Sequence, residues 1–281
     1  MFKFLLLLSL GWQSLAYAAQ PMRIVSSGGS ITEIIYALGK QDWLVATDST
    51  SLHPSAASSL PKLGYFRQLS VEGVLGFQPT DLIGAHATGP DTLAEQLRGA
   101  GVRVNILTEQ RNVAGLYELI EQVAQLVDAK PKAQVLIDNI KLQVADLKNQ
   151  AQGLRPLNVL FVMAKSERGL TVAGFNTVPQ ALFNDANMAN AAMNIPDYKV
   201  MDNESILAAN PDVVFVASHQ IHGPQDLQQL CQHPALKATT AGQHCAIYAL
   251  DSSNALALSP RYPQALKQLI TISQKVSSDG H

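Results

Sequence analysis

The pattern of hydrophobic and polar positions predicts short strands that alternate with amphipathic helices. In the first part of the chain, short apolar runs predict strands, and apolar residues three or four positions apart predict helices between them. Strands that alternate with helices form a mostly parallel sheet with both faces covered. We therefore expect an α/β lobe, with strands at 23–26, 43–47, 81–85 and 102–107 and helices at 31–38 and 93–97.

The start of the first helix carries a recognisable signal. Ser30 and Glu33 stand three apart directly before the apolar positions, which predicts a capping box, and Gly39 is expected to end the helix. Gly28 and Gly29 precede it, but the G-x-G-x-x-G spacing of a dinucleotide site is absent. We therefore expect no dinucleotide cofactor.

The longest helical pattern lies near the middle of the chain. Gly153 and Pro156 end it, and its apolar residues recur at steps of three and four, at Ala133, Leu136, Ile137, Ile140, Val144, Leu147 and Ala151. A helix of about twenty residues would be roughly 30 Å long, the width of a small domain. A second strand and helix series follows it, so the helix is expected to be a spine between two lobes.

The second series predicts another α/β lobe. Its strands are expected at 157–163, 213–217 and 246–250, and its helices at 181–186 and 262–275. The predicted organisation is therefore two Rossmann-like α/β lobes joined by a single long spine helix. The lobes are assigned to residues 19–130 and 155–281 and the linking helix to residues 131–154.

Composition and the first residues predict an exported protein. The chain of 281 residues is 47% hydrophobic, 15% charged and carries a formal charge of -2, so it can bury a core and has no basic field for nucleic acid. Lys3, the apolar run to Leu10 and the small residues before Ala19 form the three parts of a signal peptide, assigned to residues 1–18. No lipobox cysteine directly follows this leader, so we expect no lipid anchor. The exported protein is expected to be a periplasmic monomer.

The chain has two cysteines, Cys231 and Cys245. In an oxidising compartment such a pair favours a disulfide, which would contribute roughly 3 kcal/mol for a loop of this size. Two separate buried thiols are the alternative. The spacing is not that of a zinc ribbon.

A tyrosine and an arginine, Tyr65 and Arg67, stand two apart on a loop bounded by proline and glycine. A phenol has a pKa near ~10 and stays protonated at neutral pH unless its anion is stabilised, as a ferric ion and a guanidinium can do. Tyrosinate is one of the side chains that ligate haem iron. In an extended loop, Arg67 would point to the same side as Tyr65 and could reach its oxygen or a ligand carboxylate. From the spacing alone, a turn whose tyrosine only packs is the commoner alternative.

The sequence around this pair resembles a known family. The segment Gly64-Tyr65-x-Arg67-x-Leu69-Ser70-x-Glu72-Gly73-Val74-Leu75 is similar to the haem-ligating segment of the periplasmic haemin-binding proteins of bacterial haem ABC importers. The similarity extends to Arg23–Gly39 and to the region around Pro211–Val214. The resemblance implies a helix-linked, two-lobed binding protein with the ligand cleft between the lobes. It implies that the protein holds ferric haem through Tyr65, with Arg67 steadying the phenolate. It also implies delivery to an inner-membrane ABC permease and its ATPase, with no catalysis.

One departure from the family concerns a second iron ligand. Some relatives carry a histidine in the loop that corresponds to residues 163–169, and this chain has none there. The departure favours a single haem bound by Tyr65. His219 and His222 follow a predicted strand and could substitute, although loop histidines are usually just exposed.

The loops at 86–89 and 166–170 are expected at the carboxyl ends of strands, where open sheets bind ligands. Lys165 and Arg168 could meet a haem propionate there, although surface charges are usually solvated.

Glu72 and Glu204 each begin a helix-like run in their own predicted lobe. A carboxylate in a first turn complements the helix dipole, which is enough to explain either residue alone. In the proteins that the chain resembles, paired glutamates, one per lobe, dock onto arginines of the permease. The resemblance implies that role for Glu72 and Glu204.

Other functions stay open from the sequence. A Tyr-ligated haem enzyme would also use tyrosinate beside arginine, but no clear distal histidine is present. A zinc- or manganese-capturing binding protein would need His86, His219, His222 and a carboxylate to converge. A cobalamin-capturing binding protein is a further alternative. A hydrolase is disfavoured because the G-x-S-x-G motif is absent.

Overall fold

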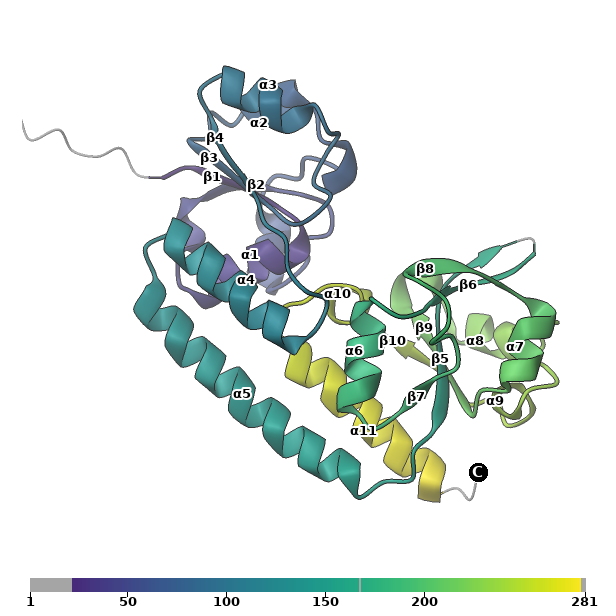
Figure 1. Cartoon of the computed structure of the whole chain (residues 1–281). Helices are drawn as coiled ribbons and strands as arrows, with labels where there is room; N and C mark the ends of the chain where they lie inside the picture. The colour runs from purple at the N-terminus through teal and green to yellow at the C-terminus, as the bar shows by residue number, and fades with distance from the viewer. Residues whose placement is uncertain (1–21, 167, 279–281) are drawn as a thin grey trace, which may run out of the picture.

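Two β-sheets, one in each half of the chain, organise the structure (Figure 1). The computed structural model describes residues 22–166 and 168–278, so the predicted signal peptide lies outside the described residues. None of the helices in these two ranges combines the length and the hydrophobicity that a membrane span requires. The predicted fold class, two α/β lobes with parallel-sheet cores, is confirmed.

The first sheet has four parallel strands in the order β2-β1-β3-β4. Ile24 of β1 packs with buried residues of α1 and α4, and its neighbour Val25 packs with those of α2 and α3, so both faces of the sheet are covered. The carboxyl ends of all four strands meet at one edge. The elements of this lobe are β1 (Ile24–Ser27), α1 (Gly29–Ala37), β2 (Leu44–Thr47), α2 (Val71–Leu75), β3 (Asp81–Gly84), α3 (Leu93–Gly99), β4 (Arg103–Ile106) and α4 (Val113–Leu126).

The second sheet has six strands, with the order β10-β9-β5-β6-β8 and β7 paired to β5. β5, β7, β9 and β10 run parallel, and β6 pairs antiparallel with β5 on one side and with β8 on the other. β6, β7 and β8 were not predicted. The elements of this lobe are β5 (Asn158–Ser166), β6 (Gly169–Ala173), α6 (Val178–Asp185), β7 (Ala189–Asn190), β8 (Tyr198–Asp202), α7 (Asn203–Ala209), β9 (Val213–Ala217), α8 (Pro224–Cys231), α9 (Thr240–Gln243), β10 (Ile247–Leu250), α10 (Ser252–Ala255) and α11 (Tyr262–Ser278).

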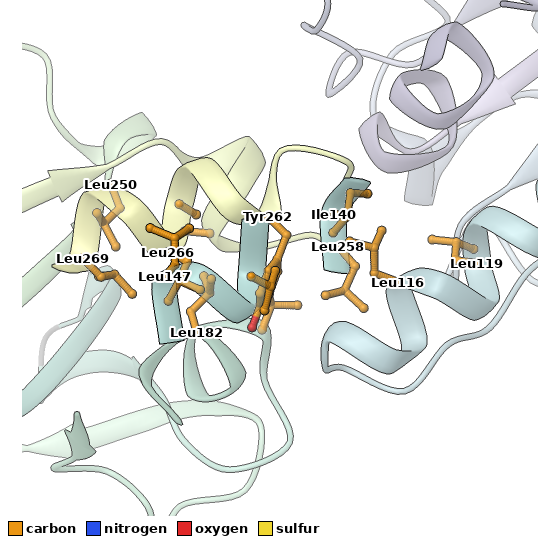
Figure 2. Packing of buried hydrophobic residues seen from close by; sticks show 14 of the residues in the cluster. Leu116, Leu119, Ile140, Leu147, Leu182, Leu250, Leu258, Tyr262, Leu266 and Leu269 are labelled. Carbon is orange, nitrogen blue, oxygen red and sulfur yellow. The ribbon is translucent and has the colours of Figure 1, made fainter. Parts of the chain in front are cut away.

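The long helix α5 (Lys130–Gln152) lies between the two series and has 23 residues, which makes it about 34 Å long. Six of its seven predicted core residues are buried, and Leu136 is partly buried. Side chains of α4, α5, α6 and α11 belong to one buried cluster that reaches both sheets (Figure 2). The two lobes are therefore joined by a shared hydrophobic core as well as by the chain.

The predicted capping box at Ser30 and Glu33 is wrong. Helix α1 starts at Gly29, with Gly28 as its N-cap and no side chain capping it. Gly28 has a φ of 98°, and a Cβ there would lie 2.7 Å from the Cβ of Ala85, so glycine is required where these two segments meet. Because the helix begins before Ser30, Glu33 lies one turn further in and pairs with Arg261 of the other lobe, with two 2.8 Å contacts.

Candidate ligand-binding site

Tyr65 lies on a loop at the carboxyl edge of the first sheet. Gly64, directly before it, has a φ of 88°, a conformation that favours glycine. The backbone N–H of Ser49 donates to the Gly64 carbonyl at 2.7 Å, and the N–H of Gly89 donates to the Phe66 carbonyl at 3.0 Å. The loops that follow β2 and β3 therefore hold the Tyr65 loop from both sides.

Among the tyrosines in residues 22–166 and 168–278, Tyr65 alone is exposed, with 45% of its surface accessible. Burial raises the pKa of Tyr198 to about 12 and that of Tyr262 well above its usual value. Burial also raises the pKa values of Tyr36 and Tyr117. A phenol that binds a metal must be reachable and must lose its proton. Tyr65 is therefore the tyrosine best placed to meet a ligand.

Arg67 does not take the predicted position. It lies in the short 3-10 helix Phe66–Gln68, not in an extended segment, so the expectation that side chains 65 and 67 point to the same side is not supported. The ring of Phe66 instead contacts both neighbours: its centroid is 4.9 Å from that of Tyr65, edge-on, and 5.2 Å from the guanidinium carbon of Arg67. Arg67 is exposed at this loop, where it can meet an anionic group of a ligand.

A buried network of hydrogen bonds fixes the position of the segment between β2 and Tyr65. The fully buried carboxylate of Asp48, directly after β2, accepts hydrogen bonds from the Gly28 N–H at 2.9 Å, the Thr50 N–H at 2.8 Å and the Ser51 hydroxyl at 2.7 Å. The Lys62 ammonium donates to the Ser51 carbonyl at 2.7 Å. Hydrogen bonds away from water hold such segments in one geometry.

Asp251 of the second lobe lies directly after β10 and contacts the first lobe near this network. Its carboxylate accepts hydrogen bonds from the Ser253 N–H at 2.9 Å and from Arg261 at 3.2 Å. His53 Nε2 of the first lobe lies 3.7 Å from Asp251. Since Arg261 also pairs with Glu33, charged contacts join the two lobes at this point.

The predicted histidines are not brought together. His219 follows β9, and its Nδ1 lies 2.7 Å from the Ser252 hydroxyl, while His222 is exposed nearby. His86 lies in the other lobe, in the loop after β3. Within the part of the chain that the structure describes, no group of three or more His, Cys, Asp or Glu residues is arranged to hold a metal ion. The set proposed for zinc or manganese is therefore not assembled.

The expected loop at residues 166–170 is largely a hairpin. Ser166 ends β5, and Gly169 and Leu170 begin β6 and pair with Ser166 and Lys165, so the prediction of a loop is wrong for residues 166, 169 and 170. Lys165 and Arg168, the suggested propionate partners, are both exposed on this hairpin.

A cavity of about 590 Å³ lies between the lobes. The first lobe contributes His86, residues 108–112 of the loop between β4 and α4, and Val113 of α4. The second lobe contributes Asn176, Thr177, Gln180, Ala181, Asn184 and Asp185. Tyr65 is not among these lining residues. However, Gly89, in the same loop as His86, exchanges backbone hydrogen bonds with Phe66 and Leu69. The loop after β3 therefore contributes His86 to the cavity and also contacts the Tyr65 loop.

Glu72 and Glu204 lie in the first turns of two short helices, one in each lobe. Ser70 caps α2 by accepting from the Gly73 N–H at 3.0 Å, and Asp202 caps α7 by accepting from the Ser205 N–H at 2.7 Å. Both glutamates are exposed. Each carboxylate is thus presented to solvent at a helix N-terminus.

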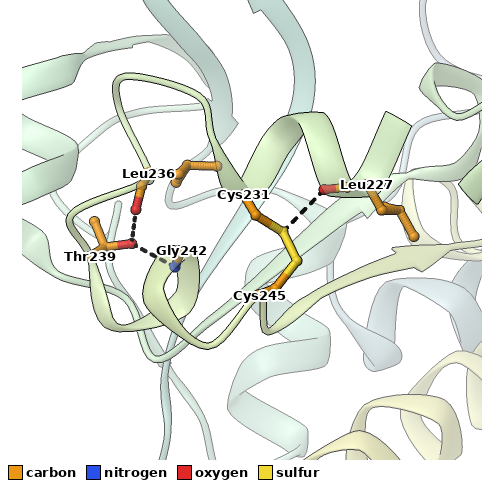
Figure 3. The surroundings of a disulfide bond; sticks show 6 residues. All are labelled: Leu227, Cys231, Leu236, Thr239, Gly242 and Cys245. Atoms are coloured by element: carbon orange, nitrogen blue, oxygen red, sulfur yellow. Dashed lines mark hydrogen bonds between the residues drawn. A yellow bond between two sulfur atoms is a disulfide. The ribbon is translucent and has the colours of Figure 1, made fainter. Parts of the chain in front are cut away.

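Cys231 and Cys245 are joined by a disulfide in the second lobe (Figure 3). Their Cα atoms are 5.2 Å apart. Between them, the Thr239 hydroxyl donates to the Leu236 carbonyl at 2.7 Å and accepts from the Gly242 N–H at 3.2 Å. The disulfide ties the end of α8 to the segment that enters β10.

Sequence reasoning did not single out Asp48, Glu109 or Arg111. Asp48 directly follows a correctly predicted strand and stands among Ser and Thr residues, a composition that favours local hydrogen bonding. Glu109 and Arg111 follow the strand predicted at 102–107, again at its carboxyl end. The position after a parallel strand was the signal that could have found all three.

Comparison with known proteins assigns the family. The family described as periplasmic binding protein matches residues 24–254, and the chain belongs to that family. Among solved structures, the apo form of the periplasmic heme-binding protein RhuT from Roseiflexus sp. RS-1 superposes with a TM-score of 0.85 at 33% identity, covering 91% of this chain and 99% of that one. The periplasmic heme-binding protein HutB of Vibrio cholerae gives a TM-score of 0.81 at 37% identity, with 89% and 98% covered.

Relatives found by sequence carry other names. The vitamin B12-binding protein of Vibrio parahaemolyticus is 28% identical over 219 residues, covering 77% of this chain and 78% of that protein. An uncharacterized ABC transporter substrate-binding lipoprotein, YvrC of Bacillus subtilis, is 27% identical over 207 residues. That match covers 72% of this chain but only 65% of YvrC, just under two thirds of its length.

The family and these neighbours define the class of protein. Periplasmic binding proteins hold a small-molecule ligand outside the cytoplasm and present it to an ABC permease and its ATPase. They are carriers and not enzymes.

Proposed function

We propose that this protein carries ferric haem: it binds haem in the cleft between its lobes, with the Tyr65 oxygen on the iron, and delivers it to an ABC permease for import. The observation that carries the proposal is that Tyr65 is the exposed tyrosine of the described chain and stands on a loop held firmly at the carboxyl edge of the first sheet. Tyrosinate is an established haem ligand. The names of RhuT and HutB support the same ligand.

Exposed apolar side chains flank the site and suit the faces of a flat macrocycle. Leu52 of the first lobe is 52% exposed and Phe175 of the second is 47% exposed. The residues that follow them contact the opposite lobe, His53 at Asp251 and Asn176 at Arg111. Exposed apolar groups on both sides of a cleft typically mark a ligand site.

We expect one haem with Tyr65 as its protein ligand. His219 and His222 are the candidates for a second ligand, and both lie in the second lobe. With Tyr65 as the sole protein ligand, the absorption spectrum of the haem complex should be the same in His219→Ala and His222→Ala as in the unaltered protein. A spectral change in one variant alone would identify that histidine as a ligand.

Glu72 and Glu204 are proposed to dock onto arginines of the permease. Their exposure on the first turns of α2 and α7 leaves both carboxylates available to a partner. One acidic group in each lobe would engage a partner that spans both lobes.

Cobalamin is the second candidate ligand, because curated relatives at up to 28% identity are named as vitamin B12-binding proteins. A Tyr-ligated haem enzyme has less support, since the family consists of carriers. Peroxide turnover by the haem-loaded protein would indicate an enzyme.

An absorption titration tests the proposal. The mature protein and Tyr65→Phe are each titrated with haemin and, separately, with cyanocobalamin. The phenylalanine keeps the ring that packs on Phe66 and removes only the oxygen. Haemin should saturate the unaltered protein at one equivalent, and Tyr65→Phe should lose the phenolate charge-transfer band and bind at least about tenfold more weakly. Unchanged spectra in Tyr65→Phe, or tighter binding of cyanocobalamin than of haemin, would contradict the proposal.

A further inference from the structure

We propose that the cavity between the lobes is a carboxylate-binding subsite, in which Arg111 receives the propionate groups of the porphyrin and so favours haem over a corrinoid. The inference rests on the proposed function and extends it to a residue that determines ligand class. It is built on the position of the cavity, on the contacts of Arg111 and on the other groups in its lining.

The cavity lies within reach of a macrocycle bound at Tyr65. Neighbouring strands are about 4.8 Å apart, so the carboxyl ends of β2 and β4, three spacings apart in the sheet, are separated by about 14 Å. The Tyr65 loop lies at the ends of β2 and β3, and the loop with Arg111 follows β4. A porphyrin with its iron at Tyr65 can therefore direct its edge toward Arg111.

Arg111 is only loosely engaged by the protein. Its Nη1 lies 3.4 Å from the Asn176 carbonyl and 4.0 Å from the Asp197 carboxylate, both in the second lobe. A guanidinium has five N–H donors in a planar fork that matches a carboxylate. These two long contacts leave the fork able to bind a carboxylate of a ligand, and they place it at the boundary between the lobes.

Glu109 has a buried oxygen that a ligand could satisfy. Within the described residues, its Oε2 is buried and has no hydrogen-bond partner. Burial raises the pKa of Glu109, and the nearby charge of Arg111 opposes that shift. Glu109 thus lies beside Arg111 in the cavity, with one oxygen that the described part of the chain leaves without a partner.

The other acidic group in the lining is already compensated. Asp185 accepts from the Lys148 ammonium at 2.6 Å and from the Tyr262 hydroxyl at 2.8 Å. The remaining polar side chains are His86 and neutral hydroxyl and amide groups, at Thr108, Gln110, Asn112, Asn176, Thr177, Gln180 and Asn184. The cavity therefore presents donors around one cation, a set that suits an anion.

This chemistry separates the two ligand classes raised by the comparisons. Haem carries two anionic propionates, whereas the periphery of a corrinoid such as cobalamin carries neutral amides. At the edge of the ring, a guanidinium gains a charge-assisted pair with propionates and not with neutral amides. Arg111 is therefore expected to contribute to haem affinity and to contribute little to binding of a ligand without carboxylates.

The test compares two variants against two probes. Arg111→Gln removes the cation from the cavity, and Lys267→Gln removes a cation from the exposed face of α11 and matches the change in net charge. Each is titrated with haemin and with haemin dimethyl ester, in the same co-solvent. We expect Arg111→Gln to bind haemin about tenfold more weakly and the diester equally well, while Lys267→Gln binds both as the unaltered protein does.

Two results would overturn the inference: an equal loss of both probes in Arg111→Gln, or a loss of haemin in Lys267→Gln as large as in Arg111→Gln. The absorption spectrum keeps the two proposals apart. If the phenolate band and its dependence on Tyr65 persist while Arg111→Gln has no selective effect, the carboxylate subsite is refuted and haem carriage stands. If haemin binding does not depend on Tyr65, the proposed function itself fails.

Discussion

Two aspartates occupy corresponding places in the two lobes, but their surroundings differ. Asp48 follows β2 and Asp251 follows β10, and each carboxylate accepts hydrogen bonds from the residues that come directly after it. Asp48 is fully buried, whereas the side chain of Asp251 is 41% exposed and contacts His53 of the other lobe. The carboxylate that follows β2 is thus enclosed in the first lobe, whereas the carboxylate that follows β10 is accessible to solvent in the second lobe.

We infer from this difference that the contacts of Asp48 and those of Asp251 have different roles. The enclosed network around Asp48 sets the geometry of the loop that carries Tyr65, as a metal ligand requires. The exposed contacts at Asp251 can change with less cost when a ligand enters between the lobes. The predictions that follow test this contrast, starting with the largest expected effect.

Replacing the two aspartates should give very different losses of stability. Asp48→Ala leaves several buried donors without an acceptor and should lower the free energy of unfolding by about 4 kcal/mol, whereas Asp251→Ala should cost about 1 kcal/mol. Urea unfolding of both variants measures this. Equal losses would contradict the contrast between the lobes.

Removing the disulfide should weaken the second lobe without disturbing the iron site. The double variant Cys231→Ser, Cys245→Ser opens a link across a sequence separation of 14 residues and should lower the free energy of unfolding by about 3 kcal/mol. The haem spectrum should not change, because Tyr65 lies in the first lobe. Chemical reduction of the unaltered protein is the matched control. An altered spectrum would show that the two lobes are coupled at the site.

Charge reversal tests whether both lobes engage the permease. Glu72→Lys with Glu204→Lys should reduce haem uptake by at least about tenfold, because two attractive contacts become repulsive. Haemin affinity of the isolated protein should stay the same. Uptake is measured in cells with the variant as the sole carrier, and each single variant shows the contribution of its lobe. Full uptake by the double variant would exclude the docking role.

Neutralising Glu109 and neutralising Asp251 should change the free energy of unfolding in opposite directions, and both changes should depend on pH. Burial raises the pKa of Glu109 above 4.5, so the unaltered protein loses stability as the pH rises from there through the raised value. Burial also acts to raise the pKa of Asp251, but hydrogen bonds from Ser253 and Arg261 lower it by more, below 3.8. The stability that Asp251 contributes is therefore present above pH 3.8 and is lost as the pH falls through its lowered value.

At pH 7, Glu109→Gln should thus be slightly more stable than the unaltered protein and Asp251→Asn slightly less stable. The first difference should vanish below pH 4.5 and the second at still lower pH. Urea unfolding across this range measures both. The same cavity as that of Glu109 is lined by His86, Arg111 and Asp185. Measuring Glu109→Gln in the Arg111→Gln background shows whether the guanidinium sets the size of the stability difference. A difference independent of pH would exclude ionisation as its cause.

Elements with a strong and regular pattern were predictable from the sequence. β9 was predicted with its observed bounds, Val213–Ala217, because every residue in it is apolar and buried. The long helix was predicted because its buried residues keep a strict spacing over many turns. β8 was missed because its residues are mostly exposed, with Val200 at 50%, at the edge of the sheet.

Features that depend on distant residues were not predictable. Glu33 was assigned to a capping box, yet its partner Arg261 is 228 positions away. The position of Tyr65 was indicated by its motif, but the orientation of Arg67 depended on a 3-10 turn that the spacing does not reveal. The cavity around Arg111 takes residues from both lobes, so no single stretch of sequence encodes it.

The central claim is a bond between the Tyr65 oxygen and haem iron, and resonance Raman spectroscopy of the haem-loaded protein tests it most directly. The account predicts vibrational bands of an iron-bound phenolate in the unaltered protein and their loss in Tyr65→Phe. Persistence of these bands in Tyr65→Phe, or their absence from the unaltered protein while haem stays bound, would contradict it.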